Sequence, residues 1–166
     1  MSETQPKTVQ VVGTVSPGLT VEAPLSGVAC VLYQCELTAI QRLLDGWERG
    51  ENGEIVGARF WVDCPLGQVL VDPTHAELTL GPVLRRRVLL GRDPAVDARI
   101  GALYQRLDRP LTRRTVACRE RLLCAGHQVV LWGELSHQPD PRGDYDGYRE
   151  PPRVPVLAAE GVESLV

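Results

Sequence analysis

The chain has no apolar run approaching the roughly 18–20 residues that a membrane-spanning helix needs. Its first residues, MSETQPKT, are polar and lack the apolar core of a secretory signal. Its five cysteines are an odd number and do not form the dense framework of a small secreted domain. We therefore expect a cytoplasmic, reducing compartment with free thiols and no membrane span, which is compatible with a position beside a membrane.

The chain also lacks a surplus of positive charge. Its 18 Lys and Arg residues are outnumbered by 21 Asp and Glu residues, giving a formal net charge of −3. Binding to nucleic acid requires a basic surplus or a basic face. Aromatic residues make up 5% of the composition, which is little for a surface that stacks bases. We therefore do not expect nucleic acid as the main partner, and an OB-like barrel that binds it is kept as an alternative.

Patterns of catalysis and metal binding are absent as well. The sequence contains no CxxC pair and no GxSxG, HExxH, P-loop or GxGxxG pattern. Cys30 and Cys35 are five positions apart, and on one continuous strand they would point to opposite faces and pack as small apolar residues. Cys64 with His75 as its base would need a nearby cation to activate the thiol, and the sequence shows none. We expect no catalytic residue, no metal and no cofactor, and hence no enzyme.

One acidic segment resembles a calcium loop. Asp140, Asp144 and Asp146 lie close together, but Arg142 and Arg153 fall where the first and twelfth ligands of an EF-hand belong. We therefore expect a solvated loop here.

Glycine and proline are plentiful, at 16 and 13 residues, which favours many turns between short strands. After Asp93 and Pro94, apolar residues recur at helical spacing and predict one helix over 94–107. We predict a mainly β (α+β) fold, namely a partly open β-barrel or sandwich of short antiparallel strands with that helix. A single domain is expected over 9–166, after a flexible leader at 1–8. The segments with strand character are 9–15, 19–23, 29–43, 59–63, 68–72, 77–80, 83–90, 115–121, 128–135 and 154–157.

Two polar segments are predicted to be loops that carry recognition, since loops on a rigid β scaffold often do. The first is 45–54, where Asn52-Gly53 is typical of a tight turn, and the second is 137–152. The last residues, 158–166, are expected to form a helical turn. Aromatic residues are enriched among binding anchors, and the candidates here are Trp47, Tyr145 and Tyr148.

A run of three arginines lies in one predicted strand. Arg85 and Arg87 would share one side of it, with Arg86 on the other. Arginines of neighbouring strands could join them, namely Arg113, Arg114, Arg119 and Arg121. An acidic protein or an anionic membrane surface would fit such a face, and a charged edge strand that resists aggregation is the alternative explanation. Arg85 and Arg87 are therefore also candidate partner-binding residues.

Several segments, taken in order, resemble one known family. APLSGVACVLYQCEL (23–37) is followed by FWVD (60–63), GQVLVDP (67–73), RERLL (119–123) and GHQVVLWGE (126–134). Their order and spacing resemble the GIDE domain, also called BAM (beside a membrane), known from a mitochondrial membrane E3 ubiquitin ligase and from bacterial proteins. The resemblance extends from about residue 11 to the end of the sequence.

The sequence also departs from that family. The ligases carry two membrane spans and a zinc-binding RING, and neither is found in this sequence. The resemblance thus implies a non-catalytic module that contacts another protein, and a position beside a membrane is compatible with it. It transfers no residue role. An accessory component of a RING-type E3 ubiquitin or ubiquitin-like transfer system, acting in trans, is the alternative it leaves open.

Overall fold

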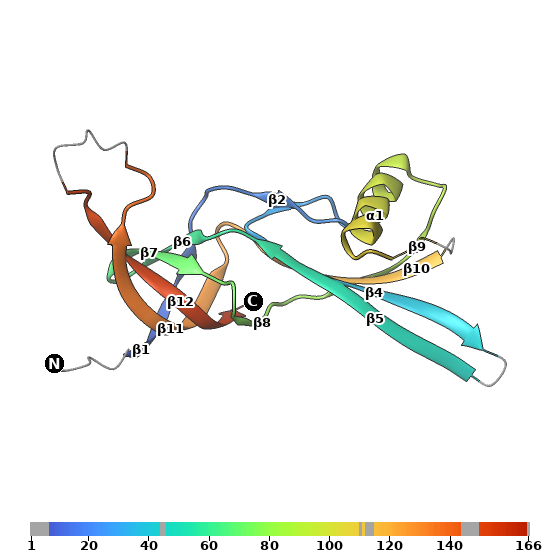
Figure 1. Cartoon of the computed structure of the whole chain (residues 1–166), viewed down its shortest axis with the longest axis horizontal. Helices are drawn as coiled ribbons and strands as arrows, with labels where there is room; N and C mark the ends of the chain where they lie inside the picture. Colours follow the sequence, from blue (N-terminus) through green and yellow to red (C-terminus); the bar gives the residue numbers. More distant parts are fainter. Residues whose placement is uncertain (1–6, 44–45, 110, 112–114, 144–149, 166) are drawn as a thin grey trace. The chain divides into compact units, whose positions relative to one another are not determined.

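The computed structural model describes residues 7–43, 46–109, 111, 115–143 and 150–165, of which 38–43 and 46–52 are described by their backbone alone. The chain forms two compact units (Figure 1). The ring unit combines 1–19, 58–80 and 125–166, and the sheet unit combines 20–57 and 81–124. That the whole of 9–166 behaves as one domain stays a prediction.

The ring unit is a mixed sheet of six strands in the order β11-β1-β6-β7-β12-β8. A further pairing between β11 and β12 joins the first five strands into a closed ring of hydrogen-bonded neighbours. The strand β12 runs parallel to β7 and β8, and all other pairs are antiparallel. The strands are β1 Thr8–Val15, β6 Phe60–Cys64, β7 Gly67–Asp72, β8 Glu77–Thr79, β11 Gln128–Pro139 and β12 Arg153–Ser164.

Alternating side chains of these strands fill the ring unit's core, as the two-residue period of a strand requires. The buried apolar residues include Val11, Val15, Phe60, Val62, Val69, Val71, Val129, Leu131, Leu157 and Val162. Two glycines allow β11 and β12 to approach closely. A Cβ on Gly133 would collide with the carbonyl oxygen of Ala158, and one on Gly161 would enter the ring of Trp132.

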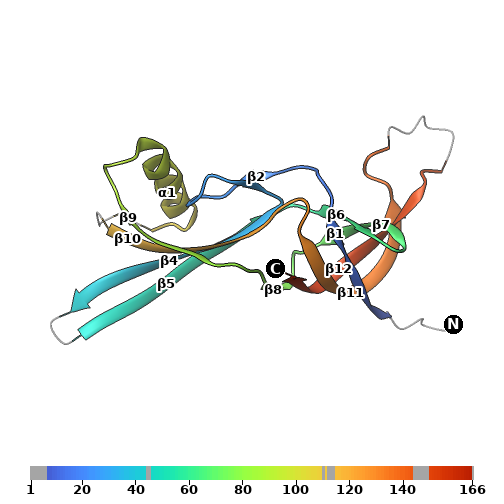
Figure 2. The same ribbon diagram turned by 180° about the vertical axis from the view of Figure 1, so that it is seen from behind.

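The sheet unit contains an antiparallel sheet in the order β5-β4-β10-β9 and a small β2-β3 ladder. One helix, α1, lies over one face of the larger sheet (Figures 1 and 2). The elements are β2 Val21–Glu22, β3 Ala29–Cys30, β4 Leu32–Leu43, β5 Gly46–Gly57, β9 Leu84–Leu89, α1 Pro94–Arg106 and β10 Thr115–Leu123. A mainly β fold with one principal helix is thereby confirmed, although β12 adds the parallel pairs that were not expected.

The helix begins where the sequence predicts. The side chain of Asp93 caps it by accepting the N–H groups of Ala95 at 3.0 Å and Val96 at 3.4 Å, and Pro94 occupies the first turn. Ile100 and Leu103 of α1 are fully buried against the sheet. Such an apolar stripe is what holds a short helix in place.

Three local predictions are wrong. The segment 45–54 is not a loop, because β5 runs through it and pairs with β4. Asn52-Gly53 lies inside that strand, where a Cβ on Gly53 would be 2.9 Å from the carbonyl oxygen of Cys35. Gly53 therefore allows β4 and β5 to approach closely, and it does not form a turn.

The segment 158–166 is not helical, since β12 continues to Ser164. Its residues pair with β11 on one side and with β8 on the other, and such tertiary pairing overrides weak local preference.

Cys30 and Cys35 do not point to opposite faces either. The strand breaks at Val31, between β3 and β4, and both thiols enter the same buried cluster. Their packing as small apolar residues agrees with this burial.

Candidate interaction surface

The sheet unit carries a basic face on the side of its sheet opposite α1. In β10, Val116 and Cys118 point into the core beneath the helix, so the alternate residues Arg119 and Arg121 lie on the outer side. In β9, Val88 packs inward, which places Arg85 and Arg87 outward with them. We call Arg85, Arg87, Arg119 and Arg121 the basic face.

The strand register brings these arginines together. Arg85 lies directly opposite Arg119, and Arg87 lies opposite Ala117. Arginines from two strands therefore meet on one face, as the sequence allowed.

One described carboxylate faces the basic face. Glu36 of β4 lies 3.9 Å from the Arg119 guanidinium and 3.8 Å from that of Arg121. Arg85 and Arg87 are exposed and make no ion pair with any described residue. Cross-strand pairs change stability by about 0.2–1 kcal/mol, and like charges directly opposite each other are destabilising, so the pair of Arg85 and Arg119 is held at the expense of stability.

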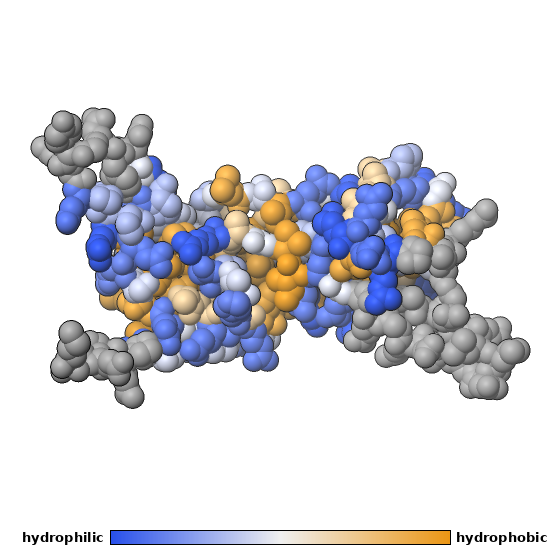
Figure 3. Space-filling view, in the orientation of Figure 1, coloured by the Kyte–Doolittle hydropathy of each residue, from blue (hydrophilic) through white to orange (hydrophobic). Residues whose placement is uncertain are grey.

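Apolar side chains border the same face. Ile55, opposite Gln34 in the strand register, is 54% exposed, and Leu89 at the end of β9 is 40% exposed. Arginine mixed with apolar side chains is typical of protein interfaces. Figure 3 shows the wider pattern, with hydrophilic side chains separating the apolar ones into patches on the face drawn there.

A buried glutamate supports β10 from the inner side. Glu120 is 1% exposed, and its carboxylate accepts the N–H of Leu25 at 2.7 Å and that of Ser26 at 3.1 Å. Arg99 of α1 donates to the carbonyl oxygen of Pro24 at 3.0 Å. The APLSG and RERLL segments, far apart in sequence, are therefore bonded to each other.

A second polar cluster joins the β4–β5 pair to the end of α1. The Tyr33 hydroxyl donates to Glu54 at 2.6 Å, and Arg106 donates twice, at 2.7 and 3.0 Å. Burial alone would raise the pKa of Glu54, but the hydrogen bonds from Arg106 and Tyr33 outweigh it and hold that pKa below 4.5. Burial and the bond to Glu54 raise the pKa of Tyr33. Both groups therefore keep their neutral-pH forms.

The ring unit has an aromatic feature of its own. The Arg142 guanidinium lies 3.7 Å above the ring of Trp61, within cation–π range. Arg142 also donates twice to Asp140, at 3.0 Å each, and once to Gln68 at 2.6 Å. The Arg142 bonds lower the pKa of Asp140. The arginine is thus held over the indole by a carboxylate and an amide.

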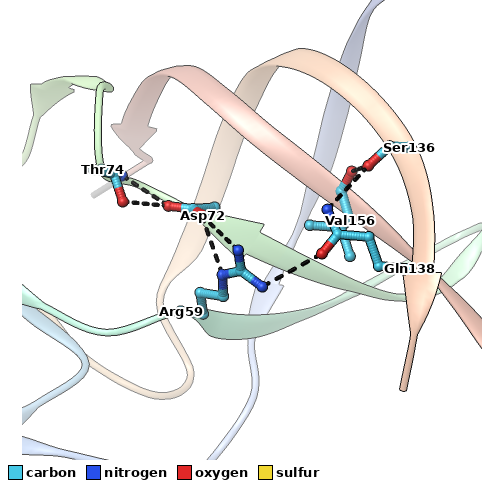
Figure 4. Close-up of polar contacts among 6 residues, drawn as sticks. All are labelled: Arg59, Asp72, Thr74, Ser136, Gln138 and Val156. Carbon is cyan, nitrogen blue, oxygen red and sulfur yellow. Dashed lines mark hydrogen bonds and ion pairs between the residues drawn. The ribbon is translucent and has the colours of Figure 1, made fainter. Parts of the chain in front are cut away.

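Another polar network crosses the ring unit (Figure 4). Arg59 forms an ion pair with Asp72 at 3.0 Å and donates to Gln138 at 3.5 Å. Gln138 donates to the Ser136 hydroxyl, which in turn donates to the carbonyl oxygen of Val156. Asp72 also accepts from Thr74, and these bonds lower its pKa despite partial burial. The network links residues in or next to four strands, and the hydroxyls of Thr74 and Ser136 both donate hydrogen bonds within it.

Three buried cysteines, Cys30, Cys35 and Cys118, are poorly suited to nucleophilic chemistry. Burial raises the pKa of Cys30 and of Cys118 to about 12, and raises that of Cys35 further. The thiols therefore stay protonated at neutral pH, whereas a nucleophile needs the thiolate. Cys64 donates to the carbonyl oxygen of Gly67 at 3.2 Å.

The described residues contain no group of three or more His, Cys, Asp or Glu side chains placed to hold a metal ion. Within the same part of the chain, no helix has the length and apolar character to cross a bilayer.

The structure places two of the five candidate partner-binding residues together, since Arg85 and Arg87 share the basic face. Trp47 lies in the part of β5 that is described by its backbone alone, and Tyr145 and Tyr148 lie outside the described residues. The role of Glu120 in holding the APLSG segment was not predicted from the sequence. The signal in the sequence that could have indicated this role is an acidic residue at a core-facing position of a strand.

No family model matches the chain, and no curated protein matches it. Among solved structures, the crystal structure of a small single-stranded DNA-binding protein from Streptomyces coelicolor is similar at a TM-score of 0.30. The identity is 14%, over 96% of this chain and 94% of that chain. A similarity at this level carries no argument about fold or binding.

Proposed function

We propose that the chain is a non-catalytic protein-interaction module, similar in kind to the GIDE domain, that binds an acidic partner through the basic face. The cross-strand pair of Arg85 and Arg119 carries this proposal. Like charges directly opposite each other cost stability, and an acidic partner turns that repulsion into attraction. A reducing, cytoplasmic setting fits the five free thiols.

The distribution of charge between the two units favours the sheet unit as the part of the chain that binds an acidic partner. It holds 13 basic and 10 acidic side chains, whereas the ring unit holds 5 basic and 11 acidic. Opposite potentials increase the rate of association and suppress wrong partners. An acidic protein would therefore meet attraction at the sheet unit.

The test is affinity capture from native lysate with matched variants. Proteins bound by wild type are compared with those bound by R85E/R87E and by the control R92E, which reverses an exposed arginine outside the strands of the sheet. We expect a specific partner that the double variant loses and the control retains, with binding that weakens as salt increases. Capture of ubiquitin-conjugating enzymes would instead favour the accessory role in a transfer system. A partner retained by all three proteins would contradict the proposal.

A second candidate function, single-stranded nucleic-acid binding by an OB-like fold, is favoured by the ring unit. Its closed order, with β7 and β12 as the parallel pair, corresponds by analogy to the strand order of OB folds. Those folds bind oligonucleotides on their second and third strands, where Trp61 and Gln68 lie. The ring unit's excess of acidic residues opposes this function. Titration of a labelled oligonucleotide with wild type and with W61A tests it, and binding lost in W61A alone would favour it.

A further inference from the structure

The strand β9 is the last of its sheet and has a strand neighbour on one side only, β10. In an antiparallel pair, alternate residues turn their N–H and C=O groups away from the partner. Within the described part of the chain, no backbone group from outside β10 is bonded to that outward row. Such an edge is a template to which an extended peptide can add as another strand.

The charge pattern of β9 selects which peptide can add. Arg85 and Arg87 project from the outer side of the sheet and Arg86 from the other, and all three are exposed. None of them makes an ion pair with a described residue. Charges that only guard an edge against aggregation need no like charge opposite them, yet Arg119 lies opposite Arg85.

We propose that β9 accepts an acidic, extended segment of a partner protein as an added fifth strand. This inference rests on the proposed function and specifies its binding mode. The main-chain hydrogen bonds would supply affinity, and the alternating side chains would supply specificity.

The side chains of β9 define the sequence of that segment. Residues opposite the three arginines are acidic on both sides of the added strand. Residues opposite Leu84 and Val88 are apolar, because those two side chains pack against the core below α1. The residue opposite Leu89, which is 40% exposed, is apolar too. The recognised pattern is apolar, three acidic, two apolar, or its reverse for the other strand direction.

The probes are labelled peptides that contain VEEEVV or its reverse, titrated into the full chain and followed by fluorescence anisotropy. Two further versions carry N-methyl groups on the odd or on the even residues of the motif, which leaves the charge unchanged. We expect one N-methylated version, which loses its three N–H donors to β9, to bind at least about ten-fold more weakly, since each lost hydrogen bond costs about 1 kcal/mol. The other version should bind within about two-fold of the parent.

The variant R86E separates strand addition from binding to the outer side alone. Arg86 is not part of the basic face, so R86E leaves simple face binding nearly unchanged. Strand addition places an acidic residue beside Arg86 as well, and we expect R86E to weaken peptide binding several-fold. Hydrogen exchange at the outward amides of β9 should slow when the peptide binds.

Two N-methylated peptides that bind as well as the parent would overturn strand addition while leaving the proposed function standing. The same conclusion follows if neither unmodified peptide binds but captured partners still depend on Arg85 and Arg87. Equal competition by a single-stranded oligonucleotide or by phosphatidylserine vesicles would identify a general polyanion surface and contradict the inference. If capture of the partner does not depend on Arg85 and Arg87, the proposed function itself is wrong.

Discussion

The two units of the chain differ in how their sheets end and in the charge that they carry. The ring unit closes its strands on one another, so that five strands each have neighbours on both sides, and it is strongly acidic. The sheet unit leaves β9 and β5 as edges, covers one face with α1 and concentrates arginine on the other. The ring unit thus pairs most of its strands on both sides, whereas the sheet unit has two edge strands and a charged face.

The largest expected effect is on the internal support of the sheet unit. We expect E120A to lower the free energy of unfolding by roughly 3 kcal/mol or more, because the buried N–H of Leu25 and the partly buried N–H of Ser26 lose their acceptor. Denaturant unfolding measures the loss, and exchange of these two amides should accelerate. The control E120Q keeps an acceptor oxygen and should lose less. Equal stability of E120A and wild type would show that this glutamate does not hold the segment.

A second prediction concerns closure of the ring unit. G133A should destabilise the chain by about 1–3 kcal/mol, since its methyl group would meet the carbonyl oxygen of Ala158. G18A is the matched control, because a Cβ there has no atom within 4 Å. Thermal unfolding of both proteins provides the comparison. If the two variants unfold alike, β11 and β12 are not as close as described.

A third prediction uses pH to test the joint between the β4–β5 pair and α1. The pKa of Glu54 is lower in the folded state than its usual 4.5, so the stability it contributes is present above that pH and lost as pH falls below it. E54Q should therefore cost roughly 1–2 kcal/mol at neutral pH, and the difference from wild type should shrink between about pH 4.5 and the lower folded pKa.

The control for this pH series is E77Q, which removes an exposed carboxylate that forms no ion pair with a described residue. Its unfolding curve should follow wild type at every pH. A constant difference between E54Q and wild type across the series would contradict a proton-linked role for Glu54.

The smallest effect runs in the opposite direction. R85Q removes the like-charge pair with Arg119 and should stabilise the chain by about 0.2–1 kcal/mol. R87Q, whose cross-strand neighbour is Ala117, should leave stability unchanged. Denaturant unfolding at low salt resolves the two. A destabilised R85Q would remove the argument that the basic face is kept at a cost.

Much of the fold could be predicted because its signals are local. The cap at Asp93, the helix that follows, and the strands around the Gly67 turn all follow from residue type and spacing. The β5 strand was missed because Asn52-Gly53 is the dipeptide of a tight turn, and only pairing with β4 shows that it lies within a strand. The break at Val31 was missed for a similar reason, since one residue of irregularity reverses the direction of Cys35.

The candidate surface could be predicted in part. Alternation on a strand correctly separates Arg86 from Arg85 and Arg87. The meeting of Arg85 with Arg119 depends on strand register across 34 positions, which no local pattern encodes. The bond between Glu120 and the APLSG segment depends on the same long-range register.

The division of the chain has a consequence for its synthesis. The sheet unit is complete once Cys124 has been made, whereas the ring unit still lacks β11 and β12 at that point. Domains generally fold as units while the chain emerges, and strand pairs distant in sequence form slowly. The sheet unit can therefore form on the ribosome while β1 lacks its partner β11 and while β7 and β8 lack their partner β12. Aggregation of nascent chains should therefore arise from β1, β7 and β8.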